Sequence, residues 1–75
     1  MIKVYSLKHI SPQDALRLVH ESGIIPYIIN WGSNIDEPNK RLIFTLKHGG
    51  GDFEEELQRV ARELDKFMRS IDAAP

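Results

Sequence analysis

The side chains able to carry chemistry are three histidines, five serines and a group of glutamates. His9, His20 and His48 lie in or beside different predicted elements, and none stands four residues from another histidine, as a metal-binding helix requires. No serine lies in the G-x-S-x-G pattern of a nucleophile elbow. A chain of 75 residues also leaves little room for a pocket that excludes water. We therefore expect no enzyme activity and no catalytic, cofactor or metal site.

The motif closest to a ligand site is the triple glycine at residues 49–51, ahead of the last predicted helix. Backbone N–H groups at a helix N-terminus bind phosphate. Asp52 and the glutamates at 54–56 follow at once and would repel that anion, and no lysine stands at P-loop spacing. The glycines are better interpreted as a strand-to-helix connector, and the glutamates as a solvated first turn.

Composition narrows the function classes further. Hydrophobic residues make up 41% of the chain and charged residues 28%, which is typical of a folded domain. A net charge of −1 lacks the basic excess of general nucleic-acid or anionic-membrane binders. Without cysteine there are no disulfides or thiolate metal sites, and no apolar run approaches the roughly 18 residues of a membrane span. We expect neither a nucleic-acid partner nor direct membrane insertion.

The elements that must position any site begin with a strand over residues 2–9, where apolar and polar residues roughly alternate. Ser11 is a predicted helix cap followed by Pro12 and Asp14, and Gly23 should end that helix. Residues 24–31 are rich in β-formers, with Pro26 marking an edge position or the start of a strand. Residues 32–34 remain open as a turn, a bulge or a kink within one long strand.

The second half predicts a hairpin and a long helix. Residues 37–40 form a turn, and the strand over 41–47 should pair with the residues before Asp36. Asp52 is the predicted cap of the last helix. The apolar residues of this helix recur at spacings of three and four, and they are Phe53, Leu57, Val60, Ala61, Leu64, Phe67, Met68 and Ile71.

The predicted order is therefore β-α-β-β-α, an α+β two-layer sandwich with a three-stranded sheet and both helices on one face. Residues 1–72 should form a single domain, and residues 73–75 a tail that begins a linker. The other face of the sheet should stay partly exposed.

The candidate interface residues are three cations and two aromatic side chains. Lys40, Arg41 and Lys47 give the hairpin a basic strip, whereas residues 52–75 hold seven acidic and four basic residues, a net charge of −3. That polarity would orient neighbouring copies head to tail. Tyr27 and Trp31 are the aromatic candidates, and Trp31 either completes the core or, if exposed, marks an interface.

Three stretches of the chain resemble a known family. Residues 4–15 hold an aromatic-bearing strand and a small-residue cap that opens a helix, and residues 36–44 hold an acidic turn with an Asn before an apolar strand. Residues 63–65 place a Leu-Asp pair near the end of the last helix. In these features the chain is similar to the short periplasmic domain repeated in bacterial secretins, the ring-forming outer-membrane channels of protein secretion and pilus export.

The resemblance implies a non-enzymatic assembly domain without cofactors. Its partners would be neighbouring copies of the same domain in a ring, together with other secretion-system proteins or cargo. Its location would be periplasmic, as part of an outer-membrane protein. If the 75 residues are instead the whole protein, we expect a cytoplasmic one.

Two other functions stay open. A KH-like nucleic-acid module shares the general fold plan, but it needs a G-x-x-G loop between two helices with basic neighbours. Here the glycines join a strand to a helix and the flank is acidic. The other alternative is a free-standing protein-interaction domain, for example a homodimer through the exposed face of its sheet.

Overall fold

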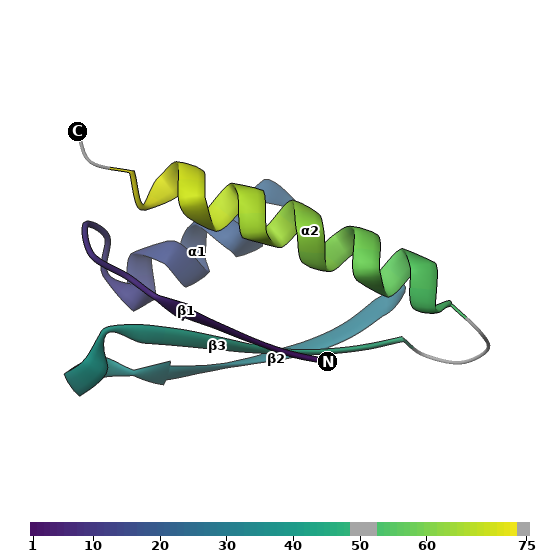
Figure 1. The fold of residues 1–75 in the computed structure, drawn as a ribbon, viewed down its shortest axis with the longest axis horizontal. Coiled ribbons are helices and arrows are strands. Elements are labelled where there is room, and N and C mark those ends of the chain that lie inside the picture. Colours follow the sequence, from purple (N-terminus) through teal and green to yellow (C-terminus); the bar gives the residue numbers. More distant parts are fainter. Residues whose placement is uncertain (49–52, 74–75) are drawn as a thin grey trace.

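A three-stranded sheet and two helices make up the computed structural model, which describes residues 1–48 and 53–73. The elements are, in chain order, β1 (Ile2–Ser6), α1 (Pro12–Ser22), β2 (Ile29–Asp36), the 3₁₀ turn η1 (Glu37–Asn39), β3 (Arg41–His48) and α2 (Glu54–Ile71). The strand order is β1-β3-β2, and β3 runs antiparallel to both neighbours. Both helices lie on the same face of the sheet (Figure 1). The predicted fold class is therefore confirmed.

Helix α1 begins and ends at the residues that carry its local signals. The Ser11 hydroxyl accepts a hydrogen bond from the Asp14 backbone N–H at 3.1 Å, and Pro12 occupies the first turn. Gly23 follows the helix with φ of 66°, the left-handed conformation that glycine adopts without steric cost. Both predicted boundaries are confirmed.

The strand expected within residues 24–31 begins later than Pro26, the position that the sequence marked as an edge position or as the strand start. The strand starts only at Ile29, whose backbone N–H donates to the Pro26 carbonyl at 3.0 Å across a turn. Pro26 lacks an N–H for a ladder, and Ile24 and Ile25 instead pack against the core from this loop. The open question at residues 32–34 is also answered, because β2 pairs with β3 without interruption from Ile29 to Asp36.

The hairpin lies where the sequence predicts it. The 3₁₀ turn η1 joins β2 to β3, and Lys40 closes the turn in the left-handed conformation, with φ of 52°. Asp36 is then the direct cross-strand partner of Arg41. The turn therefore brings an acidic and a basic side chain to the same end of the sheet.

The core fills the space between β3 and the two helices. Leu42, Phe44 and Leu46 of β3 are fully buried on the helix-facing side. The helices cover them with buried side chains from α1 (Ala15, Val19) and α2 (Leu57, Val60, Ala61, Leu64, Met68). Phe67 and Ile71 pack at the margin, as the predicted stripe requires, whereas Phe53 is 44% exposed.

Helix α2 is the longest element, at 18 residues. Its predicted cap, Asp52, lies outside the described residues, as does the triple glycine. Neither described helix combines the length and the apolar content that crossing a lipid bilayer takes.

Candidate interaction surface

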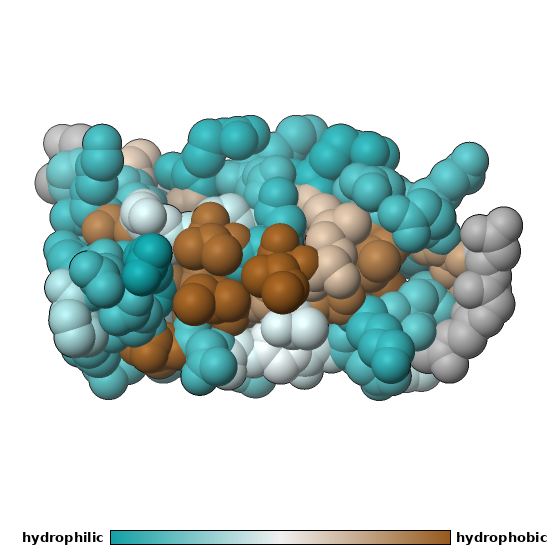
Figure 2. Space-filling view, turned by 60° about the horizontal axis from the view of Figure 1, so that its bottom comes forward, coloured by the Kyte–Doolittle hydropathy of each residue, from teal (hydrophilic) through white to brown (hydrophobic). Residues whose placement is uncertain are grey.

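The open face of the sheet, which is the face that carries no helix, holds a small apolar patch. Ile2 and Val4 of β1 are 68% and 52% exposed on this face. Ile43 of β3 is the cross-strand partner of Val4, so the three side chains are neighbours. Figure 2 shows apolar residues gathered in the middle of this face with hydrophilic residues around them. We call Ile2, Val4 and Ile43 the open-face patch.

The backbone of β1 has one edge without a partner strand among the described residues. Met1 and Leu46 exchange both backbone hydrogen bonds, at 2.7 and 2.8 Å, and the Leu7 N–H donates to the Lys40 carbonyl at 2.8 Å. In an antiparallel ladder, residues whose backbone groups hydrogen-bond to the partner strand alternate with residues whose backbone groups point away from it. The N–H and C=O groups of Ile2, Val4 and Ser6 therefore point away from β3, along the outer edge of the sheet.

The side chains on the helix-facing side of β1 are tied to α2. The Tyr5 hydroxyl donates to Asp65 Oδ1 at 2.6 Å, and Lys3 Nζ lies 3.0 Å from the same oxygen. Burial and the hydrogen bond to Asp65 raise the pKa of Tyr5 far above its usual value. Burial opposes ionisation of Asp65, but the hydrogen bonds from Tyr5 and Lys3 outweigh it and lower the pKa of this carboxyl. The sequence offered one signal for this site, a lysine on the core-facing side of a strand.

A second carboxylate, Asp72, fixes the loop between β1 and α1. It accepts hydrogen bonds from the backbone N–H groups of Lys8, His9 and Ile10, at 3.1, 2.7 and 3.2 Å. Burial raises its pKa, but these three donors outweigh burial and hold the pKa of Asp72 below its usual value. Asp72 therefore belongs to the fold rather than to the tail, and its partners lie more than 60 residues away in sequence.

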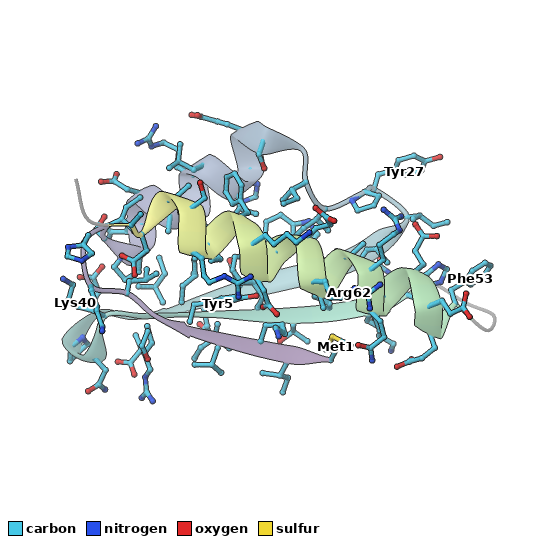
Figure 3. All side chains as sticks on the ribbon, turned by 45° about the horizontal axis from the view of Figure 1, so that its top comes forward. Met1, Tyr5, Tyr27, Lys40, Phe53 and Arg62 are labelled. Carbon is cyan, nitrogen blue, oxygen red and sulfur yellow. The ribbon has the colours of Figure 1, made fainter. Side chains whose placement is uncertain are left out.

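Between β1 and α2 runs a groove with a volume of about 180 Å³. We call it the β1 groove, and its lining residues are Tyr5, Ser6, Leu7, Asp65, Met68, Arg69 and Asp72. Figure 3 shows Tyr5 between β1 and α2. Asp65, Arg69 and Asp72 recur at spacings of four and three residues, and all three line the groove. The groove thus combines an apolar floor with a charged rim.

The three predicted basic residues are separated by the fold. Arg41 binds Asp36 through Nη2 at 2.7 Å, and Asn39 donates to the same carboxylate oxygen at 3.0 Å. The hydrogen bonds from Asn39 and Arg41 lower the pKa of Asp36. Lys40 is exposed at the turn and donates to the Lys8 carbonyl at 3.3 Å. Lys47 is exposed near the other end of β3, so Lys40, Arg41 and Lys47 do not form one continuous strip.

The two predicted aromatic candidates have different environments. Tyr27 is fully exposed in the loop before β2. Trp31 packs against the core, with its ring centroid 5.7 Å from that of Phe44 and 4.7 Å from that of His20. Trp31 therefore completes the core, which was the first of its two interpretations. In the described part of the chain, no three His, Asp or Glu side chains are placed to hold a metal ion.

Comparisons with protein families, with curated proteins and with solved structures returned no match to this chain.

Proposed function

We propose that this chain is a non-enzymatic assembly domain that contacts neighbouring protein subunits through the open face of its sheet. The observation that carries the proposal is the open-face patch, because two helices cover one side of the sheet and leave Ile2 and Val4 in solvent on the other. Exposed neighbouring β-branched side chains lose water when a protein surface covers them. The open face of the sheet therefore offers a contact surface to a neighbouring subunit.

The resemblance to the ring-building periplasmic domains of secretins makes the proposal more specific. In that role the neighbours are further copies of the same domain. A heterologous contact whose rotation closes generates a ring, and many weak lateral contacts add up. The fold has the β-α-β-β-α order, with both helices on one face of the sheet, that the sequence pattern predicts.

Sedimentation velocity at protein concentrations from micromolar to millimolar tests this role. We expect the wild-type chain to self-associate reversibly at the upper end, and Val4→Lys to remain monomeric because it places a charge in the open-face patch. Gln13→Lys, which adds the same charge on the exposed side of α1, should behave as wild type.

The size of the associated species distinguishes the two assembly roles. Association that continues beyond the dimer supports a ring, whereas association that stops at a dimer supports the free-standing interaction domain. A wild-type chain that stays monomeric at millimolar concentration would contradict assembly through this face.

A further inference from the structure

We propose that the outer edge of β1 and the β1 groove bind an extended acidic peptide segment of a partner protein, which joins the sheet as a fourth strand. This inference deepens the proposed assembly function and rests on it, because it names a second surface and the partner that this surface fits.

The backbone supplies the first part of the argument. Ile2, Val4 and Ser6 direct their N–H and C=O groups outward, since Met1, Lys3, Tyr5 and Leu7 alternate with them in the ladder with β3. An added strand would receive hydrogen bonds at every second residue along the edge, which is how peptides join exposed sheet edges elsewhere. Strand β1 also consists largely of residues that favour extended structure.

The β1 groove supplies a place for side chains of the added strand. Successive residues of a strand point to opposite faces, so every second side chain would enter the space under α2. Leu7 and Met68 are buried below that space, and Tyr5 forms its wall. A volume of about 180 Å³ accommodates an aliphatic side chain there. The alternate side chains would lie beside Ile2 and Val4 on the open face.

The charges select an acidic segment. Three cationic side chains, Lys3, Lys8 and Arg69, lie beside the edge, against the carboxylates of Asp65 and Asp72. Both carboxylates are already engaged, Asp65 by Tyr5 and Lys3 and Asp72 by three backbone N–H groups. Within residues 1–48 and 53–73, no hydrogen bond or ion pair engages the side chain of Lys8 or Arg69, and Arg69 acts on Asp65 only through space. The rim therefore carries a net positive charge.

The same charges disfavour a second copy at this edge. Two β1 strands paired about a two-fold axis would bring together the sides of both α2 helices that carry Asp65 and Arg69. Each copy carries the same cationic excess there, and like charges across an interface oppose association. An acidic peptide avoids that repulsion and neutralises the rim.

Binding of a synthetic peptide tests the proposal. The probe is acetyl-VEVLVEV-amide, whose symmetrical sequence places Val on one face of a strand and Glu-Leu-Glu on the other, whichever direction the strand runs. Its counterpart, acetyl-VKVLVKV-amide, has lysine in place of glutamate. Titration is followed by ¹⁵N NMR of the full chain. We expect the acidic probe to bind at least about tenfold more tightly, with shifted signals along β1 and the facing side of α2.

Substitutions separate the backbone from the charge contribution. Val4→Pro removes one outward N–H that β3 does not use, so the fold should survive and the acidic probe should no longer bind. Arg69→Glu should weaken acidic-probe binding about tenfold, whereas Lys66→Glu, the same charge change on the solvent side of α2, should not. If Val4→Pro fails to fold, the Arg69 and Lys66 pair still decides the question.

Several results would overturn the site. They are equal affinity for the acidic and basic probes, full affinity of folded Val4→Pro, shifted signals along β2 instead of β1, and no binding of either probe. Self-association through the open face without peptide binding would also overturn the strand-addition site while leaving the assembly role in place. Peptide binding without self-association would overturn the assembly role of the open face while leaving the strand-addition site in place.

Discussion

At the scale of single residues, Tyr5 joins the sheet to α2 through a hydrogen bond whose acceptor is a charged carboxylate. Its pKa is raised in the folded chain, so Tyr5 stays protonated where the unfolded chain begins to ionise, near pH 10. This contribution to stability is complete below pH 10 and is lost as the pH rises toward the folded value.

Substituting Tyr5→Phe should lower the free energy of unfolding by about 1 to 2 kcal/mol at pH 7. It should also reduce the loss of stability above about pH 10. Urea unfolding at both pH values measures the two effects. Tyr27→Phe is the matched control, because Tyr27 is fully exposed and makes no side-chain hydrogen bond within the described residues. Equal behaviour of the two variants would contradict the assigned hydrogen bond.

Asp72 makes the corresponding prediction in acid. Its pKa is lowered in the folded chain, so its contribution is present above the usual carboxyl value, about 3.9, and is lost as the pH falls through the folded value. Asp72→Ala should cost about 1 to 3 kcal/mol at neutral pH and should flatten the acid branch of the stability curve. Asp72→Asn, which keeps one acceptor oxygen, should cost less. If the acid branch of the stability curve is unchanged in Asp72→Ala, the role assigned to this carboxylate is wrong.

At the scale of elements, two glycines have different roles. Gly23 ends α1 with a positive φ and has no neighbouring atom within 4 Å of an added Cβ, so Gly23→Ala tests backbone strain alone. We expect a loss of about 1 kcal/mol in the free energy of unfolding. Gly32 lies within β2 with similar open space and no positive φ, so Gly32→Ala should be neutral or slightly stabilising. Thermal unfolding of the two variants would show whether they differ in this direction.

The elements that the sequence predicted well are those whose signals are local. The Ser11 cap, the Gly23 end and the α2 stripe act within a few residues, and all three are observed. The start of β2 was missed because most of residues 24–28 are β-forming types, whereas a turn closed by the hydrogen bond from Ile29 to Pro26 delays the strand. The Asp72 and Tyr5 contacts depend on residues about 60 positions apart, which no local pattern reveals. The candidate site could therefore not be located before the fold was known.

At the scale of the whole molecule, the core and the open-face patch lie on opposite faces of one sheet. Leu64 is fully buried between the layers, so Leu64→Ala should cost about 2 to 5 kcal/mol, which is a large part of the stability of so small a domain. Val4 is half exposed on the other face, and Val4→Ala should cost less than about 1 kcal/mol. Guanidinium unfolding compares the two, and similar losses would contradict the view that the open face is free for partners.

The most direct test is amide hydrogen exchange, measured by NMR on the isolated chain along β1. If the outer edge of β1 is free, the N–H groups of Lys3 and Tyr5 exchange slowly because they bond to β3, while those of Val4 and Ser6 exchange rapidly. Adding the acidic probe should then slow exchange at Val4 and Ser6. Slow exchange at all four positions before any peptide is added would show that the edge is already paired and would contradict the account.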